Sequence, residues 1–295
     1  MHHSIHRAMA LLVATLAVWT NAGLAQSAAD NERQRAIRAK QVAPNPLPVP
    51  DSVWIEELTY LDVRDRIAAG ATTAIVPTGG VEENGPYLAT GKHNVILEAL
   101  CPAIAEALGN ALCAPIVPFV PEGSFDPPSG AMHFPGSISV RAETFQALLE
   151  DIGDSMRLAG FTDVVFIGDS GGNQRGMAAA AAALNERWKN SGTRAHFVAE
   201  FYQPGWEETE TYTEEVLGVR ETKSDGHHDD IWVTAMMMVT DPQSVRHRQR
   251  VAAGLASING VDISDLDETR ELGREMVEFR ANYTARAIEA AIAAR

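Results

Sequence analysis

The sequence is short of positive charge and of long apolar segments, and each shortage excludes a class of protein. Lys and Arg together number 24 against 39 Asp and Glu, so the net charge is −15. Such a surface repels phosphate backbones and anionic lipids. The mostly apolar stretch at residues 8–19 is shorter than the roughly 20 residues that cross a bilayer. We therefore expect no nucleic-acid partner, and no membrane partner once a targeting segment is removed.

The first 25 residues have the character of a signal peptide. A polar, weakly basic start precedes the apolar stretch, and Gly23–Ala25 provides small residues for cleavage. Residues 1–25 are thus predicted to be removed on export, which gives a periplasmic or secreted protein. Residues 26–50 become rich in proline and predict an extended leader. Residues 51–295 are expected to form a single domain.

Cysteine is scarce, with Cys101 and Cys113 the only two in the chain. The CxxC spacing of a cysteine-bound structural zinc is absent. An oxidising compartment would permit a disulfide between the two residues, but whether their Cα atoms come within bonding range depends on the fold. Two buried thiols and a disulfide are both open alternatives.

Strand-like and helical segments alternate from residue 59 to residue 202. The segments predicted as strands are Thr72–Pro77, Ala114–Val120, Asp163–Ile167 and His196–Tyr202. Helices are predicted over Val95–Leu108, Ala142–Ala159 and an alanine-rich stretch ending near Lys189. This alternation is typical of an α/β protein. We expect a three-layer α/β/α sandwich with a mainly parallel central sheet.

The loops after the predicted strands are the expected location of a functional site, because ligands bind beyond the carboxyl ends of parallel strands. Three loops have this position: residues 78–94, 121–135 and 168–173. The first contains Glu82 and His93, and the third contains Asp169 and Ser170. These side-chain types bind metals, move protons or act as nucleophiles.

The loop Pro77–Leu88 resembles the signature G-x-x-E-x-H-G-P-H-L of the creatininase family of metal-dependent amidohydrolases. Further pieces resemble family segments in the same order: Trp54–Thr59, Phe134–Ser139, Gly160-Phe161 with Gly171–Asn173, and Gly226-His227 with Asp241-Pro242. The resemblance covers most of the chain. It implies an amidohydrolase of the α/β/α fold with a small-molecule substrate and one or two divalent metal ions, commonly zinc or manganese. It also implies a homo-oligomer, a hexamer in this family.

The family's metal ligands are only partly retained in this sequence. Glu82 stands where the family has its first glutamate, but Asn84 replaces a histidine and His93 replaces the aspartate that bridges two metals. Ser170 replaces another histidine, and Gly172 stands where creatininases proper have a second glutamate. The two-metal site is therefore expected to be absent.

A single divalent metal, zinc or manganese, remains compatible with the resemblance, at one ion per subunit. Three protein ligands and a water complete such a site, and the predicted ligands are Glu82, His93 and His227. The metal would activate water for attack on the carbon–nitrogen bond of a cyclic or small linear amide. Protons would be moved by Asp169, His228 or Asp229.

Two other functions stay open. Gly168-Asp169-Ser170 is similar to the nucleophile turn of SGNH-type serine esterases, and residues 225–228 contain their D-x-x-H spacing. Alternatively, the substituted ligand positions indicate a binding protein on a decayed metallohydrolase scaffold, with residues 122–128 as a pocket wall. A purely structural role for Glu82, as an ion-pair partner of Lys92, competes with its role as a ligand.

Overall fold

The computed structural model describes residues 30–294, which belong to two compact units divided between Val49 and Pro50. The predicted signal peptide lies outside the described residues. Within the first unit, residues 30–41 form a helix, where an extended leader was predicted. The prolines that disfavour a helix begin only at Pro44, so the preceding polar segment is free to be helical.

The centre of the second unit is a four-stranded sheet in the order β2-β1-β3-β4, with every neighbouring pair parallel. The strands are β1 (Thr73–Thr78), β2 (Ala111–Cys113), β3 (Asp163–Gly168) and β4 (Arg194–Phe197). Thr73 pairs with Asp163 and Thr78 with Gly168. This register brings the loops that follow β1 and β3 side by side.

Helices connect the strands and cover the sheet. They are α2 (Tyr60–Ala68), α3 (Lys92–Leu108), α4 (Ala142–Ala159), α5 (Asn173–Trp188), α6 (Gly205–Glu215), α7 (Ile231–Thr240), α8 (His247–Ala253) and α9 (Leu266–Ala293). Short 3-10 helices occupy Ile55–Glu57, Gly130–His133 and Ala199–Phe201, and β5 (Ser257–Ile258) pairs with β6 (Val261–Asp262) as a small hairpin. Within residues 30–294, none of the helices combines the length and apolar character that crossing a bilayer requires.

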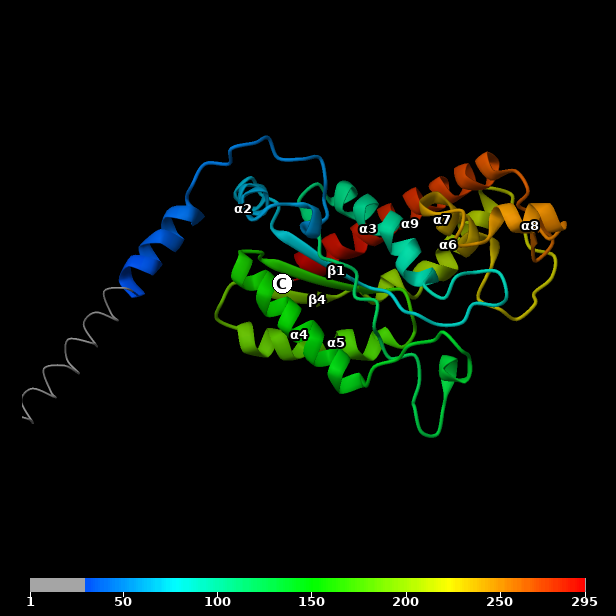
Figure 1. The fold of residues 1–295 in the computed structure, drawn as a ribbon, viewed down its shortest axis with the longest axis horizontal. Coiled ribbons are helices and arrows are strands. Elements are labelled where there is room, and N and C mark those ends of the chain that lie inside the picture. The colour runs from blue at the N-terminus through cyan, green and yellow to red at the C-terminus, as the bar shows by residue number, and fades with distance from the viewer. Residues whose placement is uncertain (1–29, 295) are drawn as a thin grey trace, which may run out of the picture. The chain divides into compact units, whose positions relative to one another are not determined.

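Side chains alternate between two hydrophobic layers, as the period of a strand requires. Ile75 and Val165 belong to the core shared with α3, α7 and α9, whereas Val76 and Phe166 belong to the core shared with α4 and α5. In Figure 1, α3 and α9 lie above the strands and α4 and α5 lie below them. The predicted α/β/α sandwich with a parallel sheet is therefore confirmed.

Two element boundaries differ from the prediction in ways that affect the site. Residues 114–120 are not a strand, because Pro115 and Pro118 have no N–H to donate; only Val117 forms an isolated bridge, with Thr78. Helix α3 begins at Lys92, three residues before the predicted start at Val95. His93 therefore lies in the first helical turn and is held by a rigid element.

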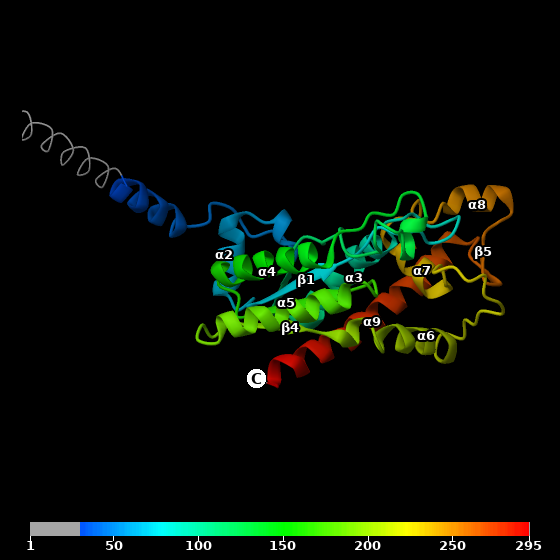
Figure 2. The ribbon, with the colours of Figure 1, turned by 90° about the horizontal axis from the view of Figure 1, so that it is seen from below.

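A disulfide joins Cys101 of α3 to Cys113 at the end of β2, with a Cα–Cα distance of 6.3 Å. Both residues are fully buried. The alternative of two free thiols is thus excluded. Beyond the carboxyl ends of the strands, helices α6, α7 and α8 gather at one end of the sandwich, as the two perpendicular views show (Figures 1 and 2).

Candidate functional site

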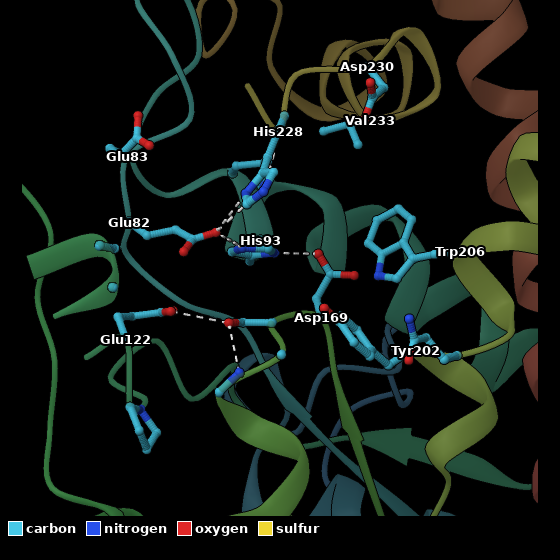
Figure 3. A pocket seen from close by; sticks show the side chains of 18 of the residues that line it. Glu82, Glu83, His93, Glu122, Asp169, Tyr202, Trp206, His228, Asp230 and Val233 are labelled. Atoms are coloured by element: carbon cyan, nitrogen blue, oxygen red, sulfur yellow. Dashed lines mark hydrogen bonds and ion pairs between the residues drawn. The ribbon is translucent and has the colours of Figure 1, made fainter. Parts of the chain in front are cut away.

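A cavity of about 660 Å³ opens where the loops after β1 and β3 meet the start of α6 and of α7. All three loops predicted from the sequence contribute to its lining. The cavity lining includes many charged, polar and aromatic side chains: Glu82, Glu83, Lys92, His93, Glu122, Asp169, Ser170, Tyr202, Trp206, His228, Asp230 and Trp232. Figure 3 shows Glu82, His93 and Asp169 in a row across it.

His93 links two carboxylates from different loops. Its Nε2 lies 2.8 Å from Glu82 Oε1, and its Nδ1 lies 2.7 Å from Asp169 Oδ2. Because ionised carboxylates only accept hydrogen bonds, both ring nitrogens act as donors. Burial and the charge of Lys92 act to lower the pKa of His93, but the hydrogen bonds with Asp169 and Glu82 outweigh them and raise it.

Glu82 is surrounded by nitrogen groups. Besides His93, the Nζ of Lys92 lies 3.8 Å and the Nδ1 of His228 lies 3.9 Å from Glu82 Oε1. Burial acts to raise the pKa of Glu82, whereas His228, His93 and Lys92 together hold it well below its usual range. Glu82 is therefore an anion at neutral pH. Its contact with Lys92 agrees with the purely structural alternative, in which Glu82 is an ion-pair partner and not a metal ligand.

Asp169 has a second cationic partner, Arg280, which comes from α9. Arg280 Nη2 lies 3.2 Å from Asp169 Oδ1 and donates to the carbonyl oxygen of Phe201. The guanidinium is fully buried and lies 3.3 Å from the ring centroid of Trp206, an arrangement in which an aromatic face stabilises the charge. Burial lowers the pKa of Arg280 to about 10, so it remains a cation.

Glu122 and Ser170 form a separate pair in the same cavity. The Ser170 hydroxyl donates to Glu122 Oε2 at 3.2 Å. Glu122 Oε1 is buried and has no hydrogen-bond partner among the described residues. Burial and the nearby charge of Glu82 raise the pKa of Glu122 to about 7. The backbone N–H of Glu122 donates to Ser139 Oγ, which fixes this loop beside the strand ends.

The glycine-rich turn after β3 is held by the first residues of α5. Asn173 Nδ2 donates to the carbonyl oxygens of Thr78 and Gly79 and to Thr78 Oγ1. Gln174 Nε2 donates to the carbonyl oxygens of Gly168 and Ser170. These amides tie the ends of β1 and β3 together, so Asp169 and Ser170 are presented on a fixed backbone.

Most of the predicted site residues converge. Glu82, His93, Asp169 and Ser170 all line the cavity, and His228 lies at its exposed rim. Figure 3 shows His228 pointing toward Glu82 from the segment that precedes α7. The geometry brings these five residues together, while their individual roles stay predictions.

The structure does not bring His227 and Asp229 to the other five residues. The His227 ring packs against Gly85, where an added Cβ would lie 2.8 Å from His227 Cγ. Asp229 is buried outside the cavity lining, near the charge of Arg250. Adjacent side chains in a non-helical segment point in different directions, so only one of residues 227–229 faces the cavity. The ligand set with His227 and the proton-transfer role of Asp229 therefore lack support from the geometry.

Sequence reasoning missed several side chains of the site. Lys92 was considered only as a partner of Glu82, and Glu122 only as part of a pocket wall. Tyr202, Trp206 and Arg280 were not singled out at all. The sequence signal that could have identified Glu122 is its position directly after an apolar run that ends beside β1. Arg280 carries no such signal, because it reaches Asp169 from a helix more than a hundred positions later.

The residues present do not fit the metal ion that the family resemblance implies. Both nitrogens of His93 are already engaged by carboxylates, and the amide Nδ2 of Asn84 donates to the backbone carbonyl of Glu82. At Gly172 a Cβ would lie 1.8 Å from the carbonyl oxygen of Pro121, so no side-chain ligand can project there. Among residues 30–294, no three His, Cys, Asp or Glu side chains are arranged to hold a metal.

Comparisons with known proteins extend over most of the chain. The creatininase family model, described as creatinine amidohydrolase, matches residues 56–288. The creatinine amidohydrolase of Pseudomonas putida is 30% identical over 103 residues, which is 34% of this chain and 38% of that protein. The mycofactocin precursor peptide peptidase of Mycolicibacterium smegmatis is 28% identical over 123 residues, which is 40% of this chain and 47% of that protein. These alignments span less than half the length of either curated relative.

Solved structures share the fold. A tryptophan-to-alanine mutant of creatininase superposes with a TM-score of 0.60 at 20% identity, covering 81% of this chain and 98% of that chain. Manganese creatininase has a TM-score of 0.57 at 21% identity, with 82% and 98% covered. A Zn-Zn form of a glutamate-to-glutamine mutant has a TM-score of 0.57 at 19% identity, with 82% and 98% covered. Because the family model covers residues 56–288, the chain belongs to the creatininase family.

Proposed function

We propose that this protein hydrolyses the carbon–nitrogen bond of a small amide, cyclic or linear, in the cavity beyond the strand ends. Family membership and the amidohydrolase relatives support hydrolysis of a carbon–nitrogen bond. One solved creatininase is a complex with creatine, which supports a small-molecule substrate. Manganese and zinc forms of relatives favour metal-bound water as the nucleophile, but the donors in this chain do not fit a metal. The proposed reaction therefore uses the protein's own side chains.

The observation that carries the proposal is the pair formed by Glu122 and Ser170 beside the row of Glu82, His93 and Asp169. Among the described residues, Glu122 has one oxygen engaged by Ser170 and one without a hydrogen-bond partner. A carboxylate in that position can accept a proton from a water molecule in the cavity. In the neighbouring row, both ring nitrogens of His93 and both oxygens of Asp169 have hydrogen-bond partners, which favours a role in positioning charge rather than in exchanging protons.

The reaction needs one proton to be moved twice. Water attacks the amide carbonyl carbon while Glu122 accepts a proton from it, and a tetrahedral oxyanion forms. The carbon–nitrogen bond then breaks as Glu122 returns this proton to the leaving nitrogen. The products are a carboxylic acid and an amine, so one water is consumed for each amide and no oxidant or reductant is required.

Replacement of Glu122 by Gln tests this role. The amide of Gln keeps a similar shape but cannot take the proton, so we expect kcat to fall by about 100-fold or more. The measurement is amine release from a panel of cyclic and linear amides. Glu106→Gln, at an exposed position of α3, is the matched control. Unchanged turnover by Glu122→Gln would remove Glu122 from the mechanism.

The contact between Ser170 and Glu122 also favours a second candidate, in which Ser170 is the nucleophile and Glu122 its base. This is the serine-hydrolase alternative in altered form, because the partner of Ser170 is a glutamate and not a histidine. Covalent labelling of Ser170 by a fluorophosphonate supports it. Activity without labelling supports the water route. Binding of small amides with neither activity nor labelling identifies the third alternative, a binding protein.

A further inference from the structure

The buried charges around His93 are already paired within the protein. Glu82 contacts His93 at 2.8 Å and Lys92 at 3.8 Å, and Asp169 contacts His93 at 2.7 Å and Arg280 at 3.2 Å. The two carboxylates therefore have three buried nitrogen-bearing partners, in addition to the exposed His228 beside Glu82. A divalent ion bound to His93 would have to displace a proton from its ring and would still add positive charge to a cluster whose anions are already paired, and burying unpaired charge is costly.

Lys92 is the unusual member of this cluster. It is only 4% exposed, and lysine is among the residues least often buried. Its Nζ donates to the backbone carbonyl of His228 at 3.3 Å. Burial lowers the pKa of Lys92, and the charges of Glu82, Asp169, Asp230 and Glu122 act against this effect by favouring the protonated form. The ammonium group thus stands among carboxylates on the cavity wall, where a bound cation would otherwise balance them.

We propose that the Lys92 ammonium group takes the place of the metal ion, so that the site works without a divalent metal. Lys92 balances Glu82 and provides positive charge to the carbonyl oxygen of a bound amide. A fixed cation at that oxygen stabilises the negative charge that develops during hydrolysis. The proposal that the site needs no metal is independent of the proposed reaction. The proposed contribution of Lys92 to turnover rests on that reaction.

Two of the positions where the family has metal ligands favour the same conclusion. Gly172 is closed off by the carbonyl oxygen of Pro121, so the second glutamate of the family pattern has no counterpart in space. Asn84 is buried, and its Nδ2 donates to the carbonyl oxygen of Glu82, whereas its Oδ1 has no hydrogen-bond partner among the described residues. A metal site would therefore have to move the backbone at Gly172 and break the Asn84 hydrogen bond that stabilises the loop.

The metal content of the purified full-length protein is the first test. We expect elemental analysis to find far less than one zinc or manganese per chain, and a melting temperature that does not change with EDTA or with added Zn²⁺ or Mn²⁺. A metal-to-chain ratio near one, with loss of thermal stability on chelation, would overturn the proposal. Both readouts are independent of activity, so the proposed function can fail without affecting them.

Variants at Lys92 form the second test. Lys92→Ala leaves Glu82 without this cation, so we expect a lower melting temperature that propylammonium ions partly restore and that Zn²⁺ does not. With an amide substrate in hand, kcat should fall by about 100-fold, with recovery in propylammonium. Lys189→Ala, whose ammonium contacts Glu186 at the surface, is the matched control. Wild-type stability and turnover in Lys92→Ala would show that Lys92 is not the replacing cation. If this variant does not fold, the metal content of the wild-type protein still tests whether the site works without a divalent metal.

Discussion

His93 is the side chain that connects the two halves of the site. It lies in the first turn of α3, yet it contacts Glu82 from the loop after β1 and Asp169 from the end of β3. Both contacts are direct; the one with Asp169 is buried and the one with Glu82 is part-buried. The histidine therefore contributes to stability and to the shape of the cavity at once.

Replacement of His93 by Ala leaves the buried Asp169 and the part-buried Glu82 with less positive charge between them. We expect the free energy of unfolding to fall by about 3–5 kcal/mol, which is typical when one partner of a buried ion pair is removed. Urea titration monitored by circular dichroism measures the change. His133→Ala, at an exposed position, should have little effect. A loss below about 1 kcal/mol for His93→Ala would show that its two contacts are weak.

Single residues also show where sequence reasoning reached its limit. Glu82, His93, Asp169 and Ser170 were predicted because each follows a strand and lies within a recognisable loop pattern. His227 and His228 are neighbours in a segment without periodicity, so the sequence does not determine which one faces the cavity. Glu122 was not identified as a site residue because its partner Ser170 lies 48 positions away. Long-range contacts of this kind depend on the packed fold.

At the scale of elements, the parallel sheet with flanking helices was predicted correctly, but two strands were not. Ala114–Val120 was wrong as a strand, and His196–Tyr202 overlaps only the end of β4 and continues into a 3-10 helix. The apolar character of Ala114–Val120 predicts burial correctly, but its prolines remove the donors that a strand needs. The contact between α7 and α9 was not predictable from the sequence, because it depends on how closely the backbones of the two helices approach each other. Gly273 of α9 lies so near α7 that an added Cβ would be 2.2 Å from the carbonyl oxygen of Ala235.

The substitution Gly273→Ala should therefore separate α9 from α7. The atom in the way is a backbone carbonyl oxygen, which cannot move unless α7 moves with it. We therefore expect a loss of about 1–3 kcal/mol in the free energy of unfolding. Gly153→Ala in α4 is the comparison, since its added Cβ would meet the end of the Leu184 side chain, which can change rotamer. Thermal and urea unfolding of both variants measures the difference. Equal losses in the two variants would argue against a backbone clash.

At the scale of the whole molecule, the disulfide between Cys101 and Cys113 agrees with an oxidising compartment outside the cytoplasm. We propose, on this basis and on the predicted signal peptide, that the mature protein is periplasmic or secreted. Assembly into a homo-oligomer is likewise a proposal that rests on the family. Fractionation of cells and light scattering of the mature protein address the two proposals directly.

Reduction of the disulfide tests its contribution to the whole fold. Because the linkage closes a short loop, with a sequence separation of 12, its loss should cost about 2–3 kcal/mol. The measurement compares urea unfolding of the oxidised and the fully reduced wild-type protein, which keeps both sulfur atoms and creates no cavity. The Cys101→Ala, Cys113→Ala double variant should lose more, since it also removes buried atoms. Identical midpoints before and after reduction would contradict the expectation.

The contact between Arg280 and Asp169 also orders the site in time. During synthesis, Asp169 is made 111 positions before Arg280, the second of its two cationic partners. A chain stopped before α9 would contain all the loops of the cavity, but its Asp169 would have His93 alone where the folded protein provides two partners. The charge balance of the cavity is therefore completed only when the last helix has been made.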